Sequence, residues 1–220
     1  RDRIIISHGH ITPGIYSVLA RYGFFDGEEM VLNFRKLGSR YAGHVETGVP
    51  GIEWNTGNLG QGMSGACGLA LASKINHISN KTIVCMGDGE QQKGQISEAR
   101  RAAVKFKLSN LIALVDYNRL QIGGSISDVM PQNIAENYHS DGWNVLFIEN
   151  GHDFEQIFQV FKKAWAHDVE NKDHPTVIIA KTQMGHGVSF MKNLADFHGR
   201  ACTDAEYKKA ISELGLPDVL

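Results

Sequence analysis

Short apolar runs alternate with longer stretches of helical spacing after about residue 80. The apolar runs are rich in β-branched residues and predict strands at Lys81–Met86, Leu111–Tyr117, Trp143–Glu149 and Thr176–Lys181. Between them, the spacing of apolar residues predicts helices at Gly94–Phe106, Pro131–His139 and Asp153–His167. Strands that are apolar on both faces and alternate with helices are typical of parallel sheets. The pattern therefore predicts an α/β fold, a doubly wound, mainly parallel sheet with helices on both faces.

Two of the expected helices carry a start signal in the sequence. Asp153 is a candidate N-cap and is followed three residues later by Gln156; Thr203 and Glu206 repeat this spacing before a short helix that ends at about Gly215. The apolar positions on one face of the earlier helix are Phe154, Ile157, Phe158 and Phe161. These signals predict where both helices begin.

The first 80 residues have a different pattern. Helical spacing predicts helices at Ile11–Tyr22 and Glu28–Leu37, and a glycine-rich loop follows at Val45–Gly60. The next stretch, Gln61–Lys74, consists mostly of glycine, alanine and serine with helical character. Small side chains allow close backbone approach, so we expect this helix to be buried against the sheet or a partner. No repeat or linker interrupts the chain, which predicts a single domain over residues 1–220.

Composition narrows the class of protein. The 220 residues are 42% hydrophobic with a net charge of −2, and acidic and basic residues are mixed, which argues against a nucleic-acid or membrane surface. No apolar run is long enough to span a bilayer. The three cysteines are far apart, as expected for a reducing cytoplasm rather than a disulfide framework or zinc site. The sequence begins at Arg1 without a methionine, which leaves an upstream segment open.

The strongest chemical signal is the segment Gly87-Asp88-Gly89 together with Asn118. Each follows a predicted strand, and in open parallel sheets ligands bind beyond the carboxyl ends of the strands. Glycines beside Asp88 let the backbone approach an anion, and the helix near Gly94 adds its positive end. Carboxylate and amide oxygens suit a hard cation such as Mg²⁺ or Ca²⁺. Each motif alone is more often a simple turn, so their spacing decides the interpretation.

Asn118 lies thirty positions after Asp88, separated by one helix and one strand. This arrangement resembles the thiamine-diphosphate motif, in which a GDG segment is followed about thirty residues later by an asparagine. In that motif the aspartate, the asparagine and the backbone carbonyl two residues later hold the metal that binds the diphosphate. The resemblance therefore implies Asp88, Asn118 and the carbonyl of Leu120 as ligands of Mg²⁺, with Ca²⁺ or Mn²⁺ as alternatives.

Further segments resemble one branch of that superfamily, the transketolases. Ser7–His10 is similar to the S-x-G-H segment of that family, and Gly43-His44 followed by Gly51–Gly62 is similar to its GH…PG-x-E-x-x-TG-x-LGQG block. The remaining similar segments are Asp88–Ala99, Asp116–Ile122, and Ala180–Thr182 through His198-Gly199. The resemblance covers nearly the whole chain and concerns the N-terminal, diphosphate-binding domain of these enzymes, which implies the thiamine-diphosphate-binding fold.

The resemblance also gives individual residues a role. It implies catalytic histidines at His10, His44 and His198, which line the channel over the reactive carbon, bind sugar hydroxyls and move protons. It implies contacts to the cofactor rings or the diphosphate side by the following residues: Gly57, Leu59, Ile122, Gly87, Gly89 and Glu90.

The chain departs from the family pattern at several positions. Lys93 stands where transketolases have a glutamate that joins a carboxylate network reaching the neighbouring subunit, so it inverts a charge near a buried acid. Asn58, Val45 and Gly123 are smaller departures. The first channel histidine of the family has no counterpart here, and neither has the pyrimidine-binding domain. The resemblance implies that this domain is supplied by a separate, transketolase C-terminal-like subunit, in a heterotetramer or a dimer of halves. The alternative is that the 220 residues are a piece of a longer chain.

The expected function is transfer of a two-carbon ketol unit from a ketose to an aldose, with sugar phosphates as the expected substrates and thiamine diphosphate and Mg²⁺ as cofactors. Two alternatives stay open. One is another thiamine-diphosphate enzyme, such as a deoxyketose-phosphate synthase or an oxo-acid dehydrogenase α subunit. The other is a non-catalytic subunit that binds the cofactor but has lost turnover, which the lysine at position 93 would indicate. A nicotinamide-binding protein is set aside, because no G-x-G-x-x-G opens a helix after the first strand.

Overall fold

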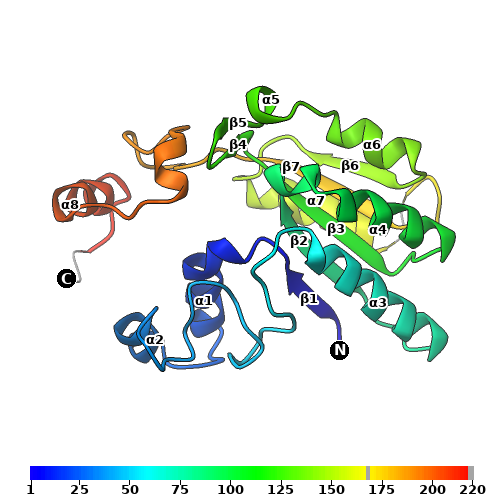
Figure 1. The fold of residues 1–220 in the computed structure, drawn as a ribbon, viewed down its shortest axis with the longest axis horizontal. Coiled ribbons are helices and arrows are strands. Elements are labelled where there is room, and N and C mark those ends of the chain that lie inside the picture. Colours follow the sequence, from blue (N-terminus) through cyan, green and yellow to red (C-terminus); the bar gives the residue numbers. More distant parts are fainter. Residues whose placement is uncertain (167–168, 218–220) are drawn as a thin grey trace.

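A parallel sheet forms the centre of the computed structural model, which describes residues 1–166 and 169–217 (Figure 1). In this described part, its strand order is β1-β2-β3-β7-β6, and every neighbouring pair is parallel. The strands are β1 (Arg3–Ile6), β2 (Thr82–Gly87), β3 (Leu111–Tyr117), β7 (Thr176–Lys181) and β6 (Asn144–Ile148). The predicted parallel sheet is confirmed, and its central strands end at a common edge.

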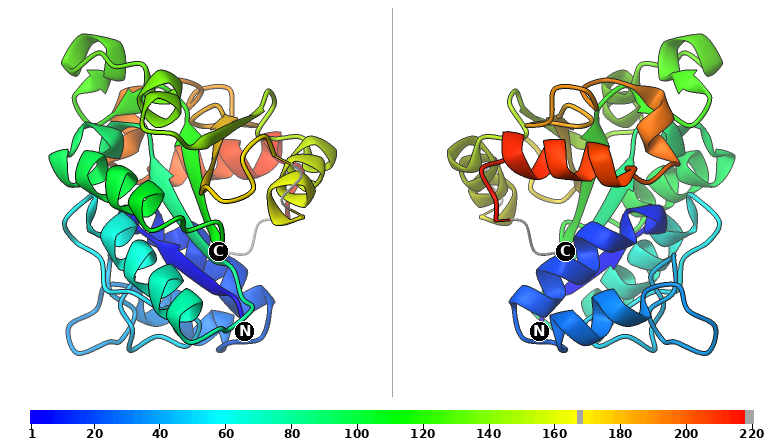
Figure 2. Two further views of the ribbon diagram at one scale, coloured as in Figure 1. Left: turned by 90° about the vertical axis from the view of Figure 1, so that its right-hand side faces the viewer. Right: turned by 90° about the vertical axis from the view of Figure 1, so that its left-hand side faces the viewer.

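Helices cover both faces of the sheet. On one face, α3 (Gln61–Ile75), α4 (Gly94–Lys105) and α6 (Ile134–Ser140) bury a core that includes Val84, Ala113 and Val177. On the other face, α1 (Thr12–Arg21) with α2 (Gly27–Asn33) packs over the β1 side, and α7 (Phe154–Trp165) packs over the β6 side. The two views of Figure 2 show these layers from opposite sides. The doubly wound arrangement predicted from the sequence is therefore confirmed.

The element bounds agree closely with the sequence pattern in the second half of the chain. β3 and β7 have the predicted ends, and α7 begins after Asp153, whose side chain accepts from the backbone N–H of Glu155 and Gln156. The predicted apolar face of α7 is divided, because Ile157 and Phe161 pack inward whereas Phe154 and Phe158 are 87% and 62% exposed. His167, the predicted last residue of this helix, lies outside the described residues.

The first half differs more from the prediction. The strand β1 was not predicted: it is a short edge strand of four residues, without a turn signal around it. The helix predicted to reach Leu37 ends at Asn33, because Phe34 leaves the helical region with a ψ of 125°, and Arg35 follows with a left-handed φ of 57°. The helix expected from Pro131 starts only at Ile134, with Asn133 as its N-cap.

Helix α3 approaches the sheet closely, as its small residues predict. A Cβ atom on Gly62 would lie 2.5 Å from the Cβ and Oγ atoms of Ser7, at the end of β1. Gly62, Ala66 and Ala70 are all buried in this contact layer. The absence of a side chain at Gly62 therefore sets the distance between α3 and the segment that follows β1.

The remaining elements are short and lie near the carboxyl edge of the sheet or at the end of the chain. They are η1 (Gly9–Ile11), η2 (Gly89–Gln92), β4 (Leu120–Gln121), β5 (Gly124–Ser125), α5 (Ile126–Val129), η3 (Ala195–His198) and α8 (Asp204–Glu213). α8 has the predicted capping box between Thr203 and Glu206. Over the described ranges, no helix is long and apolar enough to cross a membrane.

Candidate active site

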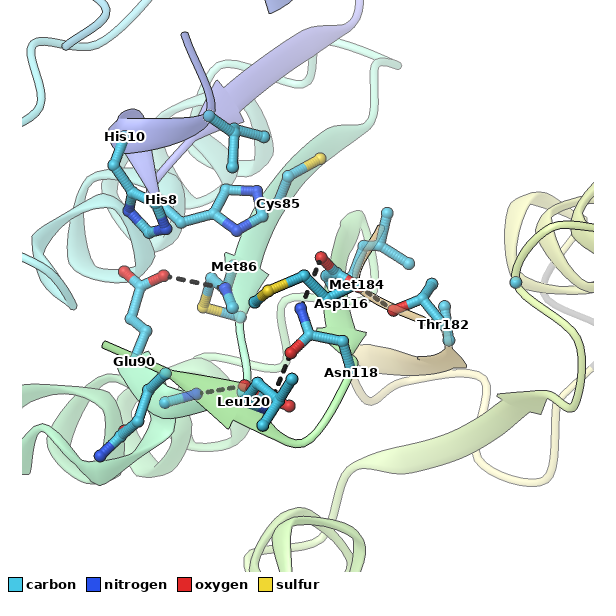
Figure 3. A pocket seen from close by; sticks show the side chains of 18 of the residues that line it. His8, His10, Cys85, Met86, Glu90, Asp116, Asn118, Leu120, Thr182 and Met184 are labelled. Carbon is cyan, nitrogen blue, oxygen red and sulfur yellow. Dashed lines mark hydrogen bonds between the residues drawn. The ribbon is translucent and has the colours of Figure 1, made fainter. Parts of the chain in front are cut away.

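A cavity of about 810 Å³ opens at the carboxyl ends of β2, β3 and β7 (Figure 3). Its polar lining comes from segments that follow the strands of the sheet, and its apolar lining comes from α1, α7, the sheet and the neighbouring loops. Most of the predicted site residues line it: Gly87, Asp88, Gly89, Glu90, Asn118, Leu120, Leu59, Ile122, His10 and His198. Gly57 and His44 are not among the lining residues. The fold thus brings together residues that lie up to 188 positions apart in the sequence.

Asp88 and the loop of Asn118 meet directly. The Oδ2 atom of Asp88 accepts a hydrogen bond of 2.5 Å from the backbone N–H of Arg119, and its Oδ1 atom accepts one of 2.6 Å from Gly89. Arg119 itself has a left-handed φ of 67°, at the turn between β3 and β4. The 3-10 turn η2 begins directly after Asp88, so its first N–H, rather than the start of α4, is the helical donor nearest in sequence.

The carboxyl group of Asp88 is 2% exposed and has no salt bridge with a cationic side chain among the described residues. Burial raises the pKa of Asp88 to about 6, although the backbone N–H groups of Arg119 and Gly89 act in the opposite direction. A buried carboxylate without a cation favours binding of a positive ion from outside. With an amide oxygen close by, this donor set fits a hard divalent cation.

Asn118 is held in a fixed orientation by its neighbours. Its Oδ1 atom accepts from the backbone N–H of Leu120 at 2.8 Å, and its amide group donates to Asp116 Oδ2 at 3.4 Å. The other oxygen of Asp116 accepts from the hydroxyl of Thr182, at the end of β7. Asp116 and Thr182 were not singled out from the sequence; they orient the amide so that its oxygen turns away from Asp116.

Glu90 is buried and already engaged within the protein. Its Oε1 atom accepts from the hydroxyl of Ser7 and from the backbone N–H of Gly60 at 2.6 Å, while Oε2 accepts from the N–H of Gly87 at 3.2 Å. Burial is the main cause that raises the pKa of Glu90, and the three donors oppose it. Glu90 therefore ties the ends of β1 and β2 to the start of α3, a role that the sequence pattern did not indicate.

Two of the three predicted histidines stand together at the mouth of the cavity. The ring centroids of His10, in η1, and His198, in η3, are 5.1 Å apart. Desolvation lowers the pKa of both rings, and for His10 the neighbouring His198 and His44 lower it further. His44 itself is exposed. The resemblance predicts all three as one group, and the structure places His10 and His198 against the cavity with His44 outside its lining.

Two further histidines line the cavity and were not predicted as site residues. His8 is 5% exposed and its ring centroid lies 6.0 Å from that of His10. His152 stacks on His186 with centroids 3.7 Å apart, and its Nε2 atom accepts from the backbone N–H of Gln183. His8 carries a usable signal, because it stands inside the S-x-G-H segment; nothing local marks His152.

The predicted ring contacts lie in different surroundings. Leu59 is half-buried in the cavity lining, whereas Ile122 is 79% exposed and so presents its apolar side chain to the opening. Gly57 is exposed, with free space around the position of a Cβ atom. Lys93 is exposed, lines the cavity and directly precedes α4 as its N-cap residue; its side chain has no hydrogen bond or ion pair within the described ranges.

Comparison with known proteins gives this site a family. Residues 1–219 match the family described as "Transketolase, thiamine diphosphate binding domain". The chain belongs to this family. It is 40% identical over 215 residues to one subunit of the apulose-4-phosphate transketolase of Phocaeicola vulgatus, covering 97% of this chain and 74% of that relative. The resemblance predicted from the motifs is confirmed.

Other members of the family differ in length. The chain is 34% identical to the 6-deoxy-6-sulfo-D-fructose transketolase subunit SqwG of a Clostridium species, covering 97% of this chain and 76% of that relative. It is 38% identical to transketolase 1 of Saccharomyces cerevisiae, covering 99% of this chain but 33% of the yeast protein. The chain therefore spans about three quarters of relatives named as subunits and about one third of this transketolase.

Solved transketolase structures share the fold. The enzyme of Campylobacter jejuni superposes with a TM-score of 0.91 at 33% identity, covering 98% of this chain and 34% of that one. The enzyme of Pichia stipitis in complex with sedoheptulose-7-phosphate gives the same TM-score at 32% identity, covering 98% and 33%. The prediction of a thiamine-diphosphate-binding fold is confirmed.

Proposed function

We propose that this chain is the diphosphate- and metal-binding domain of a transketolase that transfers a two-carbon ketol unit from a ketose phosphate to an aldose phosphate. The observation that carries the proposal is the hydrogen bond from the N–H of Arg119 to Asp88, because it joins the GDG segment to the loop of Asn118 at one edge of the sheet. In this proposal Asp88, Asn118 and the carbonyl of Leu120 hold Mg²⁺. Ca²⁺ or Mn²⁺ would suit the same oxygens.

The cofactor in this proposal is thiamine diphosphate. When bound, it supplies the carbanion chemistry by which a carbon–carbon bond is cleaved and re-formed. The Gly87–Gly89 turn would lie beside the diphosphate, and Leu59 and Ile122 offer apolar surface to the rings. Among these residues, Asp88 has the burial and the unpaired charge that a metal ion would neutralise.

The histidines handle the sugar hydroxyls in this proposal. Because their pKa values are lowered, the rings of His10 and His198 are neutral at pH 7 and each has one nitrogen that can accept a proton. A hydroxyl of the sugar placed between the two rings would donate to one ring and accept from the other. His44, exposed beside them, would contact the part of the sugar that lies farther from the cavity.

The active assembly needs a second chain in this proposal. Relatives named as subunits match this chain over most of their length, which supports a split enzyme with a C-terminal-like subunit that carries the pyrimidine-binding domain. A heterotetramer of two halves each is the arrangement we expect. The relatives' names mention a phosphate sugar and a sulfonate sugar, so the acceptor and donor panel should include apulose 4-phosphate and 6-deoxy-6-sulfo-D-fructose as well as ordinary sugar phosphates.

The test compares Asp88→Ala with the matched surface variant Asp128→Ala, which changes an exposed aspartate in α5. Calorimetry with the chain and its partner measures binding of thiamine diphosphate with and without Mg²⁺, and a product assay measures ketol transfer. We expect Asp88→Ala to abolish metal-dependent binding and transfer, while Asp128→Ala keeps both. Unchanged affinity in Asp88→Ala would refute the site. Metal-dependent binding in the wild type without ketol transfer would indicate a non-catalytic subunit instead.

A further inference from the structure

His8 occupies a place in the cavity for which the fold gives no internal reason. Its side chain is 5% exposed and lines the cavity, and neither ring nitrogen has a hydrogen-bond partner in the described part of the chain. Figure 3 shows the rings of His8 and His10 among the side chains around the cavity. The ring nitrogens are not among the fully buried, unpartnered polar atoms of the described residues, so they are accessible from the cavity. A molecule that enters the cavity can therefore reach the ring of His8.

Two carboxylates that also line the cavity have donors elsewhere in the protein. The carboxylate of Glu90 accepts from Ser7, Gly60 and Gly87, and that of Asp116 accepts from Thr182 and Asn118. The main chain around His8 is also engaged, since its carbonyl accepts from the N–H of Ile11. The ring is therefore held in position while its nitrogens are left for another molecule.

The ring lies at the end of β2. A Cβ atom built on Gly87 would be 3.5 Å from Nδ1 of His8, and Gly87 directly precedes Asp88. This is the turn whose glycines allow an anion to approach the backbone. His8 thus lies near the turn, and the centroid of the His10 ring is 6.0 Å from that of His8.

We propose that His8 is a ligand-binding residue that donates a hydrogen bond to the diphosphate group held beside the Gly87–Gly89 turn. The proposal rests on the proposed function, and it adds a contact on the diphosphate side. Burial, and then the neighbouring His10, lower the pKa of His8 to about 3, so the ring keeps one N–H and one free nitrogen at neutral pH. An N–H from a neutral ring binds a phosphoryl oxygen without adding a charge to the buried site.

The experiment measures calorimetric binding of thiamine diphosphate and of thiamine, each with Mg²⁺, to the chain with its partner. His8→Leu removes the donor at similar volume, His8→Gln keeps a donor, and His139→Leu is a matched control on the exposed surface of α6. Because a hydrogen bond to a charged group is lost, we expect His8→Leu to bind thiamine diphosphate about 10- to 100-fold more weakly. Thiamine, which lacks the diphosphate, should bind equally to the wild type and to His8→Leu. His8→Gln should recover most of the affinity for thiamine diphosphate.

The outcomes separate this proposal from the one on which it rests. Equal affinity of wild type and His8→Leu for thiamine diphosphate overturns the role of His8, and so does an equal loss for both ligands, which would indicate general packing. Asp88→Ala with wild-type affinity refutes the proposed function instead. If His8→Leu does not fold, nitrogen NMR of the wild type decides: the ring signals of His8 should move when inorganic pyrophosphate and Mg²⁺ are added, and unchanged signals overturn the proposal.

Discussion

The hydroxyl of Ser7 donates a hydrogen bond to the carboxylate of Glu90, which lies 83 positions further along the chain. Ser7 follows the edge strand β1, and Glu90 lies in η2 after the central strand β2. The same carboxylate also accepts from the backbone N–H of Gly60 at the start of α3. One buried acid therefore connects the loop before α3, the end of β1 and the GDG turn, and the shape of the cavity depends on it.

Glu90→Gln tests this connection. The amide of glutamine is a donor, so in either orientation it would place an N–H against donors that the carboxylate now accepts. We expect the free energy of unfolding to fall by about 1–3 kcal/mol, as for a buried hydrogen bond to a charged group. Urea unfolding measures the loss. Glu136→Gln, at an exposed position of α6, should leave the free energy of unfolding unchanged. If Glu136→Gln loses as much stability as Glu90→Gln, the buried hydrogen bonds of Glu90 are not the cause of the loss.

Gly62→Ala tests the close approach of α3. The added Cβ would lie 2.5 Å from the side chain of Ser7 and 2.9 Å from its Cα atom, so the main chain has to shift. We expect a loss of about 1–3 kcal/mol in the free energy of unfolding, as for an overpacked core. Gly68→Ala is the control in the same helix, where no atom lies within 4 Å of the new Cβ. It should gain about 0.5–1 kcal/mol from helix propensity. Equal effects of the two substitutions would contradict the contact.

Local patterns in the sequence predicted the central strands and the pair of Asp88 and Asn118. Both residues follow apolar runs that end at one edge of a parallel sheet, and this geometry follows from strand order alone. The capping box of Thr203 and Glu206 was predicted for the same reason, since its two residues are three positions apart. The residues that make up such a signal all lie within a few positions of one another, or within one strand–helix–strand unit, so they can be recognised in the sequence.

Long-range packing could not be predicted in the same way. Nothing near Glu90 in the sequence indicates that Ser7 and Gly60 will donate to it, because that contact exists only after α3 has packed on β1. The strand β1 is four residues long and gains its identity from pairing with β2. The exposure of His44 also depends on how the glycine-rich loop folds over α1. In each case the tertiary arrangement, rather than the local pattern, decides the position.

The buried ring of His8 should make the protein sensitive to acid. Its pKa falls from 6.5 in the unfolded chain to about 3 in the folded one, so between these values the unfolded state binds more protons. Stability is therefore complete above pH 6.5 and falls as the pH drops toward 3, by about 1.4 kcal/mol per pH unit. His8→Leu should remove this part of the slope. Urea unfolding between about pH 4.5 and 6.5 measures it.

The control for the acid slope is His139→Leu, because His139 is exposed and lies in the last turn of α6. This variant should keep the wild-type dependence on pH. His10 and His198, whose pKa values are also lowered, leave a smaller slope in His8→Leu. A pH dependence that is identical in wild type and His8→Leu would show that the ring of His8 is not held neutral by burial.

Among the described residues that line the cavity, Lys93 alone has a lysine or arginine side chain. Its ammonium group is exposed, so its attraction for an anionic ligand acts through water and is screened by salt. We expect Lys93→Gln to weaken binding of thiamine diphosphate by about 2- to 5-fold at low salt, and Lys93→Glu by more. Lys105→Gln, at the far end of α4, is the matched control. Calorimetry at low and high ionic strength measures the affinity of each variant for thiamine diphosphate. The difference in affinity between the wild type and the Lys93 variants should shrink in high salt. Tighter binding by Lys93→Glu would mean that Lys93 opposes the metal ion rather than attracting the diphosphate.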